Sequence, residues 1–170
     1  MRLFFALWPD DLQRQRLHRL TRKVVRRCGG RPIAEANLHL TLAFLGEVDA
    51  VELARTAATG VVQTEFEFAL DHYGYFAPAR SLWLGPRRLP QALMDLQAQL
   101  WDRLAAAGFP RDSKPFRPHV TLARKAPAPR AIGPPQPLVW PVKEFALIQS
   151  ETLPAGAQYQ RLHQFQLLGP

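Results

Sequence analysis

Two copies of the tripeptide His-x-Thr, eighty residues apart, are the part of this sequence best suited to chemistry. The first copy is His39-Leu-Thr41 and the second is His119-Val-Thr121, and each opens a short apolar run. An imidazole has an ordinary pKa of ~6.5, so one histidine can remove a proton while another donates one near neutral pH. Threonine hydroxyls can donate hydrogen bonds to anionic oxygens without adding charge. Such a set suits in-line attack on phosphorus, with one histidine activating the nucleophile and the other protonating the leaving oxygen.

Chance does not account for the duplication. Five histidines and seven threonines in 170 residues would give about 0.2 such tripeptides. A single copy would be explained more readily by ordinary strand residues, but two copies with matching apolar flanks favour a functional pair. Side chains alternate across a strand, so the histidine and threonine of each motif share one face, opposite an apolar back. Two such strands side by side would bring four polar side chains into one cleft.

The elements that must position these motifs are short strands and three helices. The patterns predict strands at 2–8, 38–45, 65–73, 81–85, 119–124, 138–150 and 157–168, and helices ending near 27, 62 and 107. Asp10 or Asp11 is expected to cap the first helix, and the glycine pair at 29–30 to end it. The proline-rich segment 126–137 is expected to be an extended surface connection, because proline lacks an amide donor. The order lacks regular β-α-β alternation, which favours a mixed α+β fold.

Composition narrows the class of protein. A chain of 170 residues with 47% hydrophobic residues fits one folded domain and excludes a disordered chain. Cys28 is the only cysteine, which excludes an internal disulfide and a cysteine-rich zinc module. The apolar opening at 1–8 is too short for a membrane span or a signal peptide, so it is interpreted as the first strand. We therefore expect a cytoplasmic protein with no membrane partner.

The net charge of +8 rests on eighteen arginines against four lysines. The planar arginine fork matches phosphate oxygens, so this bias suits a phosphate-rich partner, although a solvated surface would explain it equally well. The expected first helix carries seven of these basic residues: Arg14, Arg16, Arg19, Arg22, Lys23, Arg26 and Arg27. We interpret this run as a solvated helix face rather than a binding surface.

The paired motifs resemble those of the 2H phosphoesterase superfamily, and within it the RNA 2′,3′-cyclic phosphodiesterases, also called 2′-5′ RNA ligases. The resemblance rests on segments 37–46 and 116–124, with weaker matches at 2–6 and 150–159. It implies an α+β fold of two lobes related by a pseudo-twofold axis, each an antiparallel sheet backed by helices, with the active cleft between them. Residues 1–170 would then form a single bilobal domain with one His-x-Thr motif in each lobe.

The resemblance also implies a reaction. A 2′,3′-cyclic phosphate at an RNA end would be opened by water to leave a 2′-phosphomonoester, without a metal ion or other cofactor. His39 would be the proton donor to the departing 3′ oxygen and His119 the proton acceptor, with Thr41 and Thr121 beside them, but the two motifs are too symmetric for the sequence to decide between the roles. The implied substrates are RNA 3′ ends or nucleoside 2′,3′-cyclic phosphates, and the protein is expected to be a monomer.

Two further residues follow the motif histidines by five positions, namely Phe44 and Arg124. The resemblance implies that Phe44 stacks on the terminal base and that Arg124 binds phosphate, with plain core packing as the alternative for Phe44. Strict alternation would place both on the apolar back, so each strand is expected to end, twist or bulge before that point. Outside these positions, three more basic residues are expected to extend the cleft: Arg117, Lys125 and Arg130.

Three other functions can be weighed against the sequence. A ligase would join a 2′,3′-cyclic end to a 5′-hydroxyl through the same groups. A non-catalytic RNA-binding module would use the arginine-rich surface and ignore the end group. A zinc hydrolase is disfavoured, because no carboxylate or third histidine accompanies either motif at ligand spacing.

Overall fold

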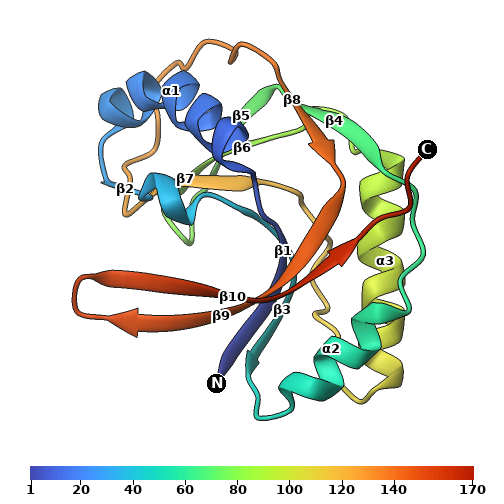
Figure 1. Cartoon of the computed structure of the whole chain (residues 1–170). Coiled ribbons are helices and arrows are strands. Elements are labelled where there is room, and N and C mark those ends of the chain that lie inside the picture. Colours follow the sequence, from blue (N-terminus) through green and yellow to red (C-terminus); the bar gives the residue numbers. More distant parts are fainter.

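The computed structural model describes the whole chain, residues 1–170, as three α-helices and ten strands (Figure 1). The helices are α1 (Asp11–Cys28), α2 (Val51–Thr59) and α3 (Gln91–Ala106), with one 3₁₀ turn, η1 (Glu35–Asn37). The strands are β1 (Arg2–Leu7), β2 (Arg31–Pro32), β3 (Leu40–Glu47), β4 (Phe66–Leu70), β5 (His72–Phe76), β6 (Ser81–Gly85), β7 (Val120–Arg124), β8 (Leu138–Val142), β9 (Glu144–Leu153) and β10 (Gly156–Gln166). No regular element covers 126–137, as the prolines predicted.

The main sheet consists of two antiparallel halves that meet at one residue pair. Its strand order is β10-β9-β1-β3-β7-β6-β5, and the short β2 pairs with β7. Within it, β3 and β7 share only the pair Leu40–Val120. We call the strands β10, β9, β1 and β3 the first lobe, and the strands β7, β6, β5 and β2 the second lobe. A separate ribbon of β4 and β8 completes the strands.

Helices pack behind both lobes. Two of them, α1 and α3, each pack against the lobe opposite to the one whose strand precedes them in the chain. Helix α1 follows β1 of the first lobe but packs against β7 and β8, whereas α3 follows β6 of the second lobe and packs against β3 (Figure 1). Helix α2 packs against α3 and β10. None of the helices combines the length and the apolar character that crossing a membrane requires. The expected α+β fold of two lobes, each with antiparallel strands and helices behind them, is confirmed.

Local signals explain where α1 begins and ends. The Asp10 carboxylate accepts a hydrogen bond from the Gln13 amide at 2.7 Å, so the expected cap is present. Gly29 ends the helix with φ 77°, a backbone conformation that side chains disfavour. Between them, Leu17 and Val25 face a core cluster of 31 buried residues that draws on both lobes.

Two expected strands were wrong, because each is broken where the chain changes sheets. The predicted strand 65–73 is interrupted at Asp71: β4 before it pairs with β8, and β5 after it pairs with β6. The Asp71 carboxylate accepts a hydrogen bond from the Arg87 amide at 2.7 Å, which holds the break. Likewise the predicted strand 138–150 is interrupted at Lys143, between β8 of the ribbon and β9 of the first lobe. Buried and more exposed residues alternate in β4 and β8 but not in β5 and β9, and such a change of pattern does not by itself reveal a change of partner.

Candidate active site

The two motifs lie beside one another at the junction of the lobes. Leu40 and Val120 are each the residue after a motif histidine, and they form the only pair between β3 and β7. Both are completely buried on the apolar back. Extending the antiparallel register by one residue places each histidine opposite the threonine of the other motif. A local twofold axis therefore relates the motifs, and all four polar side chains belong to the opposite, open face.

A β-bulge follows the threonine in both strands, which is one of the three possibilities (an end, a twist or a bulge) that the sequence left open. Residues 43 and 41 of β3 pair with successive residues of β1, so Leu42 is the extra residue. Residues 123 and 121 of β7 pair with successive residues of β6, so Leu122 is the extra residue there. Each bulge reverses the alternation that follows it. As a result Phe44 and Arg124 turn away from the apolar back and are exposed.

All six residues singled out in the sequence line one groove of about 1100 Å³. They are His39, Thr41, Phe44, His119, Thr121 and Arg124. Of the three further basic residues expected there, Arg117 lines the groove and Arg130 lines a separate cavity, whereas Lys125 lines neither. A smaller space of about 330 Å³ continues the groove beneath the β9–β10 hairpin. Within it, the Arg2 guanidinium lies 5.0 Å from the centre of the Phe44 ring.

Both histidine rings are held in the same way by the backbone. His39 Nδ1 lies 2.7 Å from the carbonyl oxygen of Asn37, and His119 Nδ1 lies 2.6 Å from that of Arg117. A carbonyl oxygen can only accept, so Nδ1 of each neutral ring carries the proton and donates it. The Nε2 atom of each ring is thereby left as an acceptor. Two equivalent nitrogens are thus available to exchange protons with a bound molecule.

Burial and a nearby cation keep both rings neutral in the free protein. Burial, together with the Arg124 charge and His119, lowers the pKa of His39 from 6.5 to about 4, and the hydrogen bond to Asn37 only partly opposes this shift. Burial and the Arg124 charge also lower the pKa of His119. One guanidinium therefore acts on both imidazoles. A bound phosphate anion would have the opposite effect, because it favours the protonated rings.

An aromatic cluster surrounds His39. The Trp8 ring stacks on the imidazole with 5.3 Å between centroids and 8° between planes. Phe4 lies at 5.0 Å and Tyr159 lies edge-on at 5.2 Å. Phe4 belongs to a small apolar cluster on the open face of the first lobe, with Trp8 and Tyr159 at its margin. This cluster provides the burial that depresses the His39 pKa.

Fewer rings surround His119. Phe76 lies edge-on at 4.9 Å and Trp83 lies at 5.9 Å. Trp83 is the cross-strand partner of Gly74, and a Cβ on that glycine would lie 1.9 Å from the Trp83 ring. The missing side chain of Gly74 therefore makes room for the ring beside His119.

None of these aromatic residues was predicted from the sequence to belong to the site. Phe4 could have been found, because alternation in β1 places it on the face opposite Leu3 and Phe5. Trp8 and Tyr159 lie outside the motifs and reach His39 only through the fold. Of the remaining histidines, His18 contacts Glu35 at 3.2 Å and His163 packs on Phe165, so neither reaches the groove.

The family model for the 2′-5′ RNA ligase superfamily matches residues 8–154. The chain belongs to this superfamily. The resemblance seen in the motifs is thereby confirmed. The chain is 38% identical to the RNA 2′,3′-cyclic phosphodiesterase of Escherichia coli, over 98% of this chain and 96% of that protein. It is 37% identical to the enzyme of the same name from Thermus thermophilus, over 99% and 91% of the two chains.

A solved structure agrees with the sequence matches. The crystal structure of E. coli LigT complexed with 3′-AMP superposes with a TM-score of 0.89 at 36% identity, covering 98% of this chain and 97% of that one. The superfamily, the named enzymes and this nucleotide complex therefore match nearly the whole chain and not the motifs alone.

Proposed function

We propose that this chain is an RNA 2′,3′-cyclic phosphodiesterase in which His39 and His119 act as general acid and general base. The observation that carries the proposal is the local twofold axis, which places two equivalent histidines with available Nε2 atoms in one groove. The relatives that match the whole chain carry the same enzyme name. The substrate is an RNA end, or a nucleoside, that carries a 2′,3′-cyclic phosphate.

The two histidines divide the proton transfers of one hydrolytic step. His119 takes a proton from water as the water oxygen bonds to phosphorus. The bond from phosphorus to the 3′ oxygen breaks on the opposite side. His39, which takes up a proton at Nε2 when the anionic phosphate binds, donates that proton to the departing oxygen. The products are a 2′-phosphomonoester and a free 3′-hydroxyl, and one proton exchange with solvent resets both rings. Each proton transfer of this kind contributes roughly 10²–10⁴-fold to the rate.

The other groove residues bind the phosphate and the base. Thr41 and Thr121 donate hydrogen bonds to the non-bridging phosphate oxygens, and Arg124 adds a charge-assisted contact. Phe44 is 45% exposed, so its free face can stack on the terminal base. The other face is covered by Arg2, which would complete a layered stack of cation, ring and base.

The name of the superfamily supports a second candidate, which is 2′-5′ RNA ligation. In that reaction the attacking oxygen is a 5′-hydroxyl of another RNA instead of water, and the same two histidines serve. Water is present at far higher concentration, so we expect hydrolysis to dominate. Incubating two RNA halves with the protein separates the reactions by the size of the product.

The proposed activity is tested with adenosine 2′,3′-cyclic phosphate in the presence of EDTA. We expect complete conversion to adenosine 2′-phosphate, identified by phosphorus NMR, because only the bond to the 3′ oxygen breaks. Accumulation of the 3′-phosphate, or a loss of turnover on adding EDTA, would contradict the mechanism. RNA binding that ignores the end group, without any turnover, would instead support a non-catalytic RNA-binding module.

Three expectations from the sequence complete the proposal. We expect residues 1–170 to act as a single bilobal domain with one motif in each lobe, and the protein to be a monomer because one chain supplies both histidines. The cytoplasmic location inferred from cysteine usage stays a prediction. Sedimentation of the purified protein tests the oligomeric state.

A further inference from the structure

A second arginine lies directly beside Arg124 without a counter-charge. Arg31 of β2 pairs with Arg124 of β7 across the antiparallel ladder. Directly opposite residues place their Cβ atoms about 4.5–5.5 Å apart on the same face, where like charges destabilise the pairing. Ile33, two residues after Arg31, lines the groove, so alternation also directs Arg31 to the groove side. Neither arginine takes part in any of the ion pairs of the molecule.

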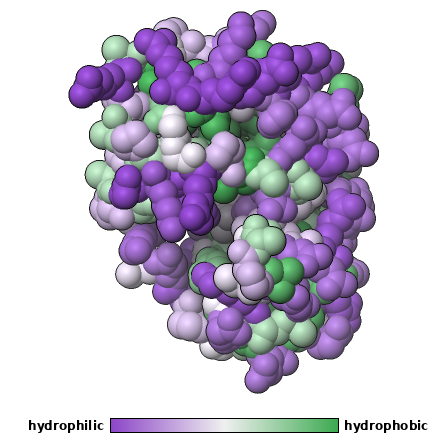
Figure 2. Space-filling model, turned by 90° about the vertical axis from the view of Figure 1, so that its left-hand side faces the viewer, coloured by the Kyte–Doolittle hydropathy of each residue, from purple (hydrophilic) through white to green (hydrophobic).

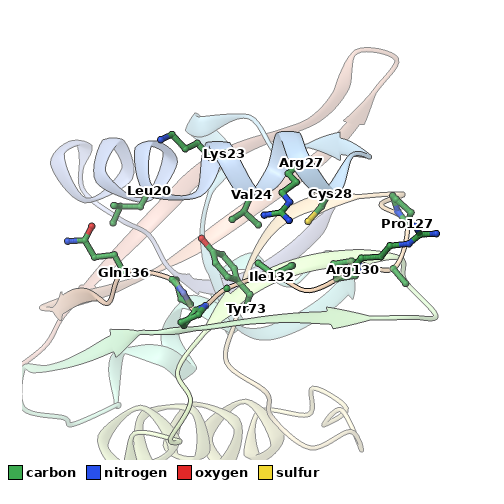
Figure 3. Close-up of a pocket in the computed structure, with 15 residues that line it drawn as sticks. Leu20, Lys23, Val24, Arg27, Cys28, Tyr73, Pro127, Arg130, Ile132 and Gln136 are labelled. Atoms are coloured by element: carbon green, nitrogen blue, oxygen red, sulfur yellow. The ribbon is translucent and has the colours of Figure 1, made fainter.

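A cavity of about 680 Å³ lies between α1, β5 and the proline-rich segment (Figure 3). Lys23 and Arg27 of α1 and Arg130 of the proline-rich segment line it, and none of the three has a carboxylate partner. Arg27 reaches down from α1 and the Tyr73 hydroxyl points up toward the helix (Figure 3). Burial raises the pKa of Tyr73, so its hydroxyl stays protonated and can donate. The volume is in the range of small-ligand sites, and the lining supplies cations and donors.

The unpaired charge extends along the whole of α1. Its seven basic residues face one acidic residue of the helix, Asp11, which pairs with Arg14 alone. The other six cations have no partner, and the 18 residues of the helix span about 27 Å at 1.5 Å per residue. Figure 2 shows hydrophilic side chains gathered along the top of this face, over α1. Charge spread over such a length fits a polyanion better than one small phosphate.

The end of α1 is fixed against the strand that carries Arg124. At Gly30, where φ is +89°, an added Cβ would lie 2.7 Å from both the Arg124 carbonyl oxygen and the Ala126 Cα. Strand β2 follows α1 in the chain and pairs with β7 (Figure 1). Arg31 therefore lies between the end of α1, which carries Arg27, and Arg124 of the groove. We call Arg31, Lys23, Arg27 and Arg130 the basic track.

We propose that the basic track binds backbone phosphates of the RNA strand on the 5′ side of the cyclic end. The inference rests on the proposed function, which places the cyclic end at Arg124. The strand leaves the groove over Arg31, where its phosphate offsets the repulsion between the two arginines. It then continues past the cavity to the exposed face of α1, which the sequence alone had suggested to be a solvated surface. The enzyme would thereby prefer RNA ends to free cyclic nucleotides.

The test compares two substrates in a matched pair of triple variants. The track variant replaces three of the four residues of the basic track and leaves Arg31 in place: Lys23→Ala/Arg27→Ala/Arg130→Ala. The control variant removes the same number of positive charges elsewhere on the molecule: Arg55→Ala/Arg88→Ala/Lys143→Ala. On a single-stranded RNA of about 12 nucleotides with a cyclic end, the track variant should raise KM about tenfold or more and reduce the log–log salt slope by about 2. On adenosine 2′,3′-cyclic phosphate its kcat and KM should stay within about twofold of wild type.

An unchanged KM for the RNA in the track variant would overturn the proposal, as would an equal rise in the control variant. The proposal would also be overturned if the track variant lost its affinity for AMP while its KM for the RNA stayed unchanged, because the cavity would then be a site for free nucleotides. Failure of the proposed function is recognised separately, since the wild type would open neither substrate. In that case the anisotropy of the same RNA, labelled with a fluorophore, must still show weaker binding to the track variant.

Discussion

His39 and His119 occupy equivalent positions in their motifs and make equivalent hydrogen bonds, but their surroundings differ. His39 is enclosed by three aromatic rings and its pKa falls to about 4, whereas His119 contacts two rings. Two identical tripeptides in the sequence thus give two chemically different imidazoles. The difference arises from residues 8 and 159, which are remote in the chain, so the motifs alone could not indicate which histidine has which role.

The stacked Trp8 ring should control the acidity of His39. Replacing it in Trp8→Ala admits water to the imidazole, so the His39 pKa should rise from about 4 toward 6.5 and kcat should fall about tenfold as the ring loses its fixed orientation. Trp8→Phe retains a ring and should behave much more like wild type. Proton NMR titration of the imidazole measures the pKa. An unchanged His39 pKa in Trp8→Ala would contradict this account.

The depressed pKa of His39 also makes the fold sensitive to acid. Below pH 6.5 the unfolded chain binds a proton at this histidine, but the folded protein does so only near pH 4. The unfolded state therefore binds more protons in this window, and the free energy of unfolding should fall as the pH falls, by about 3 kcal/mol in total. In His39→Gln, urea unfolding at pH 7 and pH 4.5 should show a loss smaller than that of wild type by about 2 kcal/mol. Equal losses in the two proteins would refute the assigned burial.

At the scale of strands, the paired bulges are what make the site. Without the extra residues Leu42 and Leu122, Phe44 and Arg124 would project into the core side of the sheet. A departure from regular alternation could be predicted, because the family resemblance gave stacking and phosphate-binding roles to two residues that alternation assigns to the apolar back, but its form as a bulge could not. The changes of sheet at Asp71 and Lys143 could not be predicted either, because they depend on which distant strand becomes the neighbour, and the local pattern of a strand does not name its partner.

Gly74 should be sensitive to the smallest substitution. In Gly74→Ala the new methyl group would overlap the Trp83 ring, so this ring, which lies 5.9 Å from the His119 ring, must shift. We expect a loss of about 1–3 kcal/mol in the free energy of unfolding, as for an overpacked core, together with a lower kcat. Gly133→Ala is the matched control, since a Cβ there meets nothing within 4 Å. Thermal unfolding and turnover of a cyclic nucleotide would check both; equal behaviour of the two variants would argue against this role of the glycine.

For the molecule as a whole, the sequence predicted two lobes but not how they are joined. The lobes share a single strand pair, yet α1 and α3 each connect one lobe to the other, and one cluster of 31 buried residues includes β1, β3, β6 and β7. Such crossings depend on contacts between distant segments, which a pattern of local periodicity does not encode. The lobes are therefore expected to stabilise each other.

A shared core should make unfolding a single cooperative transition. Circular dichroism and tryptophan fluorescence should give the same midpoint in urea. The four tryptophans sample different parts of the fold, because Trp8 follows β1, Trp83 lies in β6, Trp101 in α3 and Trp140 in β8. Two separated transitions would show instead that one lobe retains its structure without the other.

The central claim is that the two motif histidines act together on one phosphate. Turnover of adenosine 2′,3′-cyclic phosphate in EDTA by His39→Ala, His119→Ala and the double variant tests it most directly, with circular dichroism to verify the fold. Each single variant should lose roughly 10²–10⁴-fold in kcat, and the double variant should be about as slow as the slower single one, because both groups serve the same step. Either single variant retaining kcat within about tenfold of wild type would contradict the account.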